Sequence, residues 1–171
     1  MSYGSSVPSL SGSVTGLVNG DSLSGATTGS ATYSSTASAT SNVGSYAING
    51  SGLSASNYNF VQAVSNATAL AISRAPLTIT ASNATKTYGQ TAALTAFTSS
   101  GLQNSETIGS VTETSSGSAA TAGVGSSPYT IVPSAATGGT FNAANYSITY
   151  ANGALAISRA PLTITASNAT K

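Results

Sequence analysis

Residues 69–86 read ALAISRAPLTITASNATK, and residues 154–171 repeat this stretch without a change. The two copies lie 85 residues apart in a chain of 171, so the identity cannot be a chance match. A fixed period of this kind indicates a tandem array of one structural unit. The sequence therefore predicts repeats of about 85 residues instead of one larger domain.

The repeated block contains two strand-like patterns separated by a proline. Residues 77–80, LTIT, alternate apolar and polar side chains with period two, and so does the LAI of residues 70–72. Pro76 stands between the two patterns, where it ends one strand and begins the next because it cannot donate to a ladder. We therefore expect repeat 1 to be 1–75 without its first strand, repeat 2 to be 76–160, and 161–171 to be the first strand of a following repeat.

Other segments match at nearly the same offset. Tyr3-Gly4 matches Tyr88-Gly89, 16–23 matches 101–108, 43–48 matches 124–131 after a short insertion, and 57–60 matches 145–148. Short strands with turn residues between them are typical of small all-β domains. The prediction is two tandem β-sandwich-like domains arranged end to end, with β-grasp-like units as the alternative.

The predicted core of a complete repeat is thin for its length. We expect the paired tyrosines to pack in it, since equivalent positions in each repeat favour a structural role. The predicted core residues are Leu77, Ile79, Tyr88, Leu94, Phe97, Leu102, Ile108, Tyr129, Ile131, Phe141, Tyr146, Ile148, Leu155 and Ile157.

The composition excludes several classes of function. Four basic and three acidic residues give a net charge of +1, which offers no basic surface for nucleic acid or an anionic membrane. The chain has no Cys for disulfides or thiolate metal sites and no His for general-base catalysis. No apolar run is long enough to insert in a bilayer, and the N-terminus does not resemble a signal peptide.

The few chemically useful side chains do not form a convincing site. Lys86 could activate a serine, Glu106 and Glu113 could form a glycosidase pair, and Asp21 beside Asn19 could bind calcium weakly. We favour solvated or hydrogen-bonding turn residues for all of them. The sequence thus predicts no enzyme, no metal site and no cofactor. Tyr33 and Tyr150 lack counterparts and are the tyrosines expected to be exposed.

The motifs LTITASNATKTYG, GLVNGDSLSG, NVGSYAI, NYNF and ALAIS occur in this order, and together they resemble the MBG-type repeat, the variant marked by Tyr-Gly. Repeat 2 departs from the second motif, with GLQNSE. The resemblance covers nearly the whole chain. It implies a location outside a bacterial cell or on its surface, tandem repetition, and a role in large adhesins similar to filamentous haemagglutinin.

Three functions follow as expectations. The leading one is a non-catalytic stalk or spacer of a bacterial surface or secreted adhesin, in contact with neighbouring repeats. The second is a module that binds host glycan or mucin. The third is a filament subunit that donates Leu162, Thr163, Ile164 and Thr165 head to tail to another copy, adding a strand to repeat 1.

Overall fold

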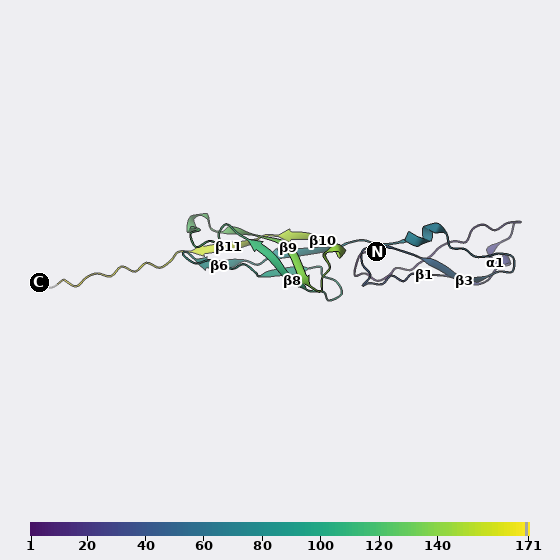
Figure 1. Cartoon of the computed structure of the whole chain (residues 1–171), viewed down its shortest axis with the longest axis horizontal. Coiled ribbons are helices and arrows are strands. Elements are labelled where there is room, and N and C mark those ends of the chain that lie inside the picture. Colours follow the sequence, from purple (N-terminus) through teal and green to yellow (C-terminus); the bar gives the residue numbers. More distant parts are fainter. Residues whose placement is uncertain (170) are drawn as a thin grey trace. The chain divides into compact units, whose positions relative to one another are not determined.

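The computed structural model describes residues 1–169 and 171; Thr170, part of the predicted strand segment 161–171, lies outside the described residues. The chain forms two compact units (Figure 1). Unit 1 consists of Met1–Ala75 and Ala144–Ser147, and unit 2 of Pro76–Ala143 and Ile148–Lys171. Strands hold 39% of the chain and helices 9%, so the predicted all-β fold in two tandem units is confirmed.

Two sheets make up the second repeat. The three-stranded sheet has the order β10-β5-β7, and the four-stranded sheet has the order β6-β11-β9-β8. The strands are β5 (Ala75–Ala81), β6 (Ala84–Thr87), β7 (Phe97–Ser100), β8 (Ile108–Thr114), β9 (Tyr129–Gly139), β10 (Tyr146–Ala151) and β11 (Gly153–Ser158). Two short 3-10 helices, η2 (Val124–Ser126) and η3 (Ala143–Asn145), lie between them.

The core of unit 2 lies between these sheets. Ala81 of β5 packs with Ile131 of β9 and Leu155 of β11, and all three are at most 2% exposed. Strand β5 alternates as predicted, since Leu77 and Ile79 are buried while Thr78 is exposed and Thr80 is half-buried. The period-two pattern therefore places one face of β5 in a sandwich core.

Unit 1 contains two two-stranded sheets. Strand β1 pairs with β3 and β2 pairs with β4, both antiparallel. Its elements are α1 (Leu23–Ala26), β1 (Thr28–Ser34), β2 (Gly44–Tyr46), β3 (Asn49–Ser54), η1 (Val64–Thr68) and β4 (Leu70–Ile72).

The two repeats share their strand register. Leu70 pairs with Tyr46 in the first repeat, and Leu155 pairs with Tyr129 in the second. The backbone N–H of Tyr3 donates to Ser73 O at 2.9 Å, and that of Tyr88 donates to Ser158 O at the same distance. The repetition in sequence is thus a repetition of hydrogen bonds.

The match of Leu23 to Ile108 is wrong. Ile108 begins β8, whereas Leu23 begins helix α1, which is capped by the Ser22 hydroxyl accepting from Gly25 N at 3.2 Å. The structural counterpart of β8 is β1, so α1 is an insertion in the first repeat. A Ser before a short turn favours such a cap, which the strand-like spacing did not reveal.

This shift gives Tyr33 a counterpart, which the sequence comparison missed. Tyr33 pairs with Gly50 across β1 and β3, and Glu113 pairs with Pro133 at the equivalent place across β8 and β9. An aromatic ring on β1 in one repeat is therefore replaced by a carboxylate on β8 in the other.

Tyr88 does not belong to the core. Its side chain is 47% exposed, whereas that of its counterpart Tyr3 is 5% exposed. The difference arises because Tyr3 packs against the ring of Tyr146 in unit 1.

Candidate functional site

A tyrosine pair joins the two repeats in the core of unit 1. The rings of Tyr3 and Tyr146 lie edge to face, with centroids 5.5 Å apart and planes at 80°. Both are nearly fully buried. Such pairs add stability beyond the burial of apolar area. The segment 144–147 therefore supplies a core side chain to the unit formed by the first repeat.

Asn145 fixes the same segment through its amide group. Its Oδ1 accepts from Val43 N at 3.0 Å and its Nδ2 donates to Asn42 Oδ1 at 2.8 Å. The side chain is 1% exposed, so these bonds satisfy polar groups that water does not reach. Arg74 Nε donates to Ala144 O at 3.2 Å as well. The segment is held by polar contacts and by one aromatic ring.

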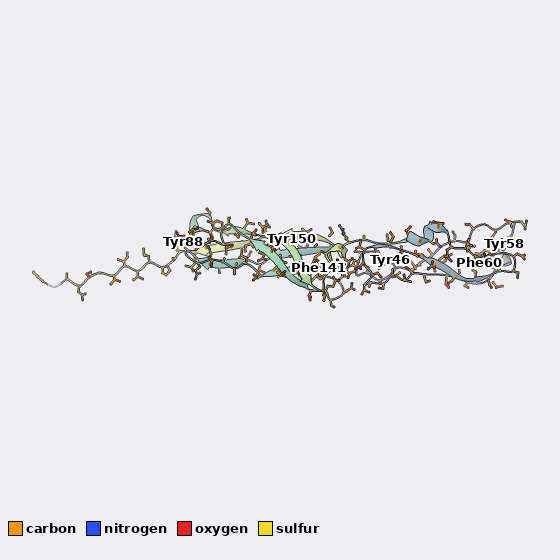
Figure 2. The ribbon with its side chains drawn as sticks, viewed as in Figure 1. Tyr46, Tyr58, Phe60, Tyr88, Phe141 and Tyr150 are labelled. Atoms are coloured by element: carbon orange, nitrogen blue, oxygen red, sulfur yellow. The ribbon has the colours of Figure 1, made fainter. Side chains whose placement is uncertain are left out.

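The counterparts of this segment in the first repeat are Asn57 and Tyr58, and neither is buried. The Tyr58 hydroxyl donates to Asp21 Oδ2 at 2.6 Å and accepts from Val18 N at 3.2 Å. The hydrogen bond to Asp21 raises the pKa of Tyr58. Asp21 is thus a hydrogen-bonding turn residue that holds the hydroxyl of Tyr58; Figure 2 labels Tyr58.

The predicted strand-donating residues Leu162, Thr163, Ile164 and Thr165 lie outside any strand. Figure 1 shows this stretch, in yellow, running on from the end of β11 with no segment beside it. Leu162 is 90% and Ile164 92% exposed, whereas Leu77 and Ile79 in the identical first copy are 1% and 0% exposed. One sequence therefore has two environments in one chain.

The two glutamates are not brought together. Glu106 lies in the turn before β8 and Glu113 near its end, and the strand alone separates Ile108 from Glu113 by roughly 16 Å. That span exceeds the carboxyl separations of glycosidase pairs. The expectation that Glu113 is a solvated turn residue is also wrong, because its Oε1 is buried without a hydrogen-bond partner. Burial raises the pKa of Glu113.

Lys86 is a buried structural cation. Its side chain is 6% exposed, and Nζ donates to Gln90 O at 3.0 Å and to Ala119 O. The Lys86 ammonium therefore donates to two backbone carbonyls, and these hydrogen bonds connect β6 to the loops that contain Gln90 and Ala119. Within the described part of the chain, no group of three or more His, Cys, Asp or Glu side chains could hold a metal ion.

Tyr33 and Tyr150 both have structural contacts. A Cβ atom at Gly12 would lie 2.5 Å from Tyr33 Cε1, so the half-buried ring covers this glycine. The Tyr150 hydroxyl accepts from Ala136 N at 2.9 Å, and the side chain is 36% exposed. Of the two tyrosines expected at the surface, only Tyr150 offers an exposed ring.

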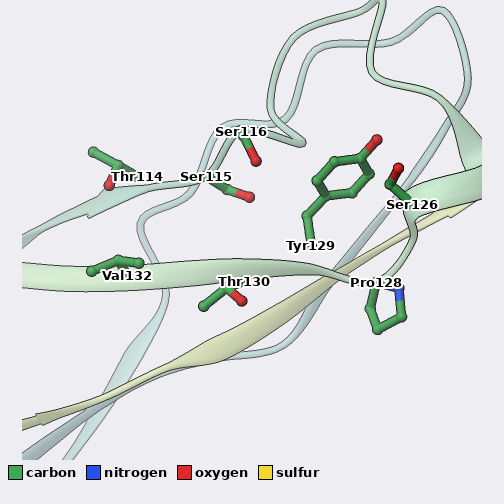
Figure 3. A pocket seen from close by; sticks show the side chains of 8 residues that line it. All are labelled: Thr114, Ser115, Ser116, Ser126, Pro128, Tyr129, Thr130 and Val132. Atoms are coloured by element: carbon green, nitrogen blue, oxygen red, sulfur yellow. The ribbon is translucent and has the colours of Figure 1, made fainter.

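An open depression on unit 2, of about 470 Å³, lies beside the ring of Tyr129 (Figure 3). The Tyr129 hydroxyl donates to Gly123 O at 2.9 Å, so its proton is engaged by the backbone. The lining residues are Thr114, Ser115, Ser116, Ser126, Pro128, Tyr129, Thr130 and Val132. The lining carries hydroxyl groups and no charged side chain.

The model of the MBG domain (YGX type) matches residues 1–68 and again residues 77–156. The chain belongs to this family. The two matches make it a tandem array of MBG repeats, and the resemblance seen in the sequence is confirmed. No curated protein and no solved structure matches the chain. In the described residues no helix is long and apolar enough to cross a membrane.

Two recurring motifs of the MBG repeats contact each other in unit 1. The tyrosine of the Tyr-Gly motif is buried in one repeat by the Asn-Tyr segment of the other. Sequence comparison found both motifs, through their recurrence, but assigned each to the interior of its own repeat.

Proposed function

We propose that the chain is a non-catalytic spacer in a large bacterial surface or secreted adhesin, where its MBG repeats hold a binding region away from the cell. The observation that carries the proposal is the sharing of residues between repeats. Residues 144–147 of repeat 2 belong to unit 1. A repeat that depends on its neighbour for a core side chain resists independent movement, which suits a load-bearing array.

The composition supports the same role. The chain has four basic residues, three acidic residues and no His. The charge of its surface therefore changes little with pH or salt, which suits an environment outside the cell where neither is regulated. Its polar surface comes from Ser and Thr, which supply 58 residues. A spacer needs no ligand, cofactor or metal, and its partners are the neighbouring repeats.

Small-angle scattering of arrays with two, four and six repeats tests the spacer. A stiff array lengthens in proportion to the number of repeats, whereas freely jointed repeats lengthen with about its square root. A matched array carrying Tyr146→Ala in every repeat is the control, because it removes the shared ring and is expected to bend more. Square-root growth of the unaltered array would contradict the proposal.

A second candidate is a module that binds host glycan or mucin, favoured by the hydroxyl-lined depression beside Tyr129. Rings flanked by hydroxyl groups suit sugar binding. A glycan array probed with the native chain and with Ser116→Trp, which fills the depression, tests this. Thr121→Trp, at an exposed position outside the lining, is the control. The absence of glycan binding by the native chain would remove this candidate.

A further inference from the structure

Strand β5 is the middle strand of a three-stranded sheet, between β10 and β7. It runs antiparallel to β7, with Thr78 opposite Ser100 and Thr80 opposite Thr98. Leu77 and Ile79 point to the core, and both are buried. The sheet therefore depends on a strand of this sequence at its centre.

In the first repeat the segments equivalent to the two outer strands have no ladder. Residues 12–15 correspond to β7 and residues 58–63 to β10, and neither segment contains strand residues. In the second segment Phe60 is 39% and Val61 81% exposed, and Val64 beyond it is 94% exposed. Figure 2 labels Tyr58 and Phe60 in this stretch. Among the described residues, unit 1 thus presents two segments outside any ladder, together with exposed apolar side chains.

A glycine marks the same site in both repeats. Gly101 has φ +106°, and a Cβ atom there would lie 2.4 Å from Pro76 O of β5. Its counterpart Gly16 keeps the same conformation, with φ +94°, but a Cβ there would meet nothing within 4 Å. A left-handed residue without Cβ is needed where another backbone approaches closely. Gly16 therefore retains the geometry for an approaching strand, with the space beside it open.

The second copy of the β5 sequence lies exposed in the same chain. Residues 160–166 read APLTITA, identical to β5, and Leu162 and Ile164 face solvent. We propose that residues 160–166 of one molecule add to unit 1 of a second molecule as a middle strand between its segments 12–15 and 58–63. The register of β5 and β7 then places Thr165 opposite Ser13 and Thr163 opposite Thr15.

A second contact accompanies the strand. Tyr3 packs on Tyr146 in unit 1. The counterpart of Tyr3 is Tyr88, whose side chain is 47% exposed, and the counterpart of Tyr146 is Tyr58, which is half-buried. Docking of the strand brings Tyr88 of the donor molecule against Tyr58 of the acceptor. Donor and acceptor surfaces differ, so the contact is heterologous and propagates head to tail instead of closing a dimer. The contact does not depend on the spacer function, because stiff arrays could form from chains that never self-associate.

Sedimentation velocity over a range of concentrations tests the assembly with matched variants. Ile164→Lys charges the face that β5 buries, whereas Thr163→Lys places the same charge on the face that β5 leaves exposed. We expect the native chain and Thr163→Lys to assemble, and Ile164→Lys and a chain ending at Arg159 to stay monomeric. The expected loss for Ile164→Lys is at least about tenfold in association constant. A monomeric native chain, or equal effects of both lysines, would overturn the proposal.

Disulfide trapping tests the register and the identity of the partner. The native chain has no Cys, so every disulfide that forms must involve the introduced cysteines. Molecules with Ser13→Cys mixed with molecules with Thr165→Cys are expected to form a mixed disulfide dimer. The mismatched mixture of Ser13→Cys with Thr163→Cys is expected to form several-fold less. Equal trapping in both mixtures refutes the register. A disulfide that forms only within one chain carrying Ser13→Cys and Thr165→Cys shows that the segment folds back, and refutes docking on a second molecule.

Discussion

The ring of Tyr146 stands edge-on to the ring of Tyr3, 5.5 Å away, although the two residues come from different repeats. Their burial contrasts with the exposure of Tyr88, which occupies the position of Tyr3 in the next repeat. The tyrosine of the Tyr-Gly motif is therefore a core residue only where an Asn-Tyr segment covers it. Matched substitutions in the two repeats can measure this dependence directly.

Replacement of the buried tyrosine should cost far more than replacement of its exposed counterpart. Tyr3→Ala is expected to lower the free energy of unfolding of unit 1 by about 3 kcal/mol, because it removes a buried ring and leaves a cavity. Tyr88→Ala is expected to cost less than about 1 kcal/mol. Urea denaturation followed by tyrosine fluorescence measures both. Equal losses would show that the pair with Tyr146 is not the source of stability.

The Asn145 amide should behave in the same asymmetric way. Asn145→Ala removes both hydrogen bonds of a buried amide, from half-buried Val43 N and to exposed Asn42 Oδ1, at an expected cost of about 1–2 kcal/mol. Asn57→Ala changes an exposed amide at the equivalent position and is the control. Thermal unfolding monitored by circular dichroism should separate the two variants. A stable Asn145→Ala would mean that water replaces the lost bonds.

The two copies of the β5 sequence should respond differently to one substitution. Ile79→Ala removes a fully buried side chain and is expected to cost about 2–5 kcal/mol. Ile164→Ala, measured on dilute monomeric protein, is expected to change stability by less than about 0.5 kcal/mol. Chemical denaturation of both variants at low concentration is the measurement. A large loss for Ile164→Ala would place this residue in a core of its own chain.

Lys86→Met tests the buried ammonium. The substitution keeps a similar apolar stem but leaves Gln90 O and Ala119 O without their donor, at an expected cost of about 1–3 kcal/mol. Lys171→Met removes an exposed ammonium from the second copy of the same sequence and should have no effect. Denaturation at several salt concentrations provides the check. A neutral Lys86→Met would show that the packing of the stem, and not its hydrogen bonds, holds the two loops.

Glu113 should make the stability of unit 2 depend weakly on pH. Burial raises the pKa of Glu113 in the folded state, so the folded chain binds more protons than the unfolded chain near the ordinary value. Stability from this group is fully present below about pH 4 and declines as pH rises through the raised pKa. The effect is small, because the partly exposed carboxyl group is screened by solvent. Glu113→Gln should flatten this part of the pH profile; a profile identical to the native one would exclude Glu113 as its source.

The repeats and their strands were predictable because alternation and recurrence are local properties of the sequence. The LTIT strand with its buried Leu77 and Ile79 followed from period two alone. Helix α1 was missed because it depends on one side-chain cap at Ser22, within a segment that otherwise matches a strand. The exposure of Tyr88 was missed because burial depends on a partner distant in sequence.

The candidate site was predictable only in part. The spare copy of the strand could be read from the repeat, but the acceptor could not, because the open space beside Gly16 exists only in three dimensions. The assignment of residues 144–147 to unit 1 had no signal in the sequence, since Asn145-Tyr146 matches Asn57-Tyr58 as an ordinary internal motif.

We expect each repeat to be completed by residues of its neighbour, with the second LTIT segment as the middle strand of the repeat that follows it. Amide hydrogen exchange on a longer chain, with a further copy of residues 87–171 appended after Lys171, tests this most directly. We predict that the amides of residues 162–165, exposed in the 171-residue chain, become as protected as those of residues 77–80. Exchange at 162–165 that stays as fast as in the shorter chain would show that this segment does not complete the following repeat.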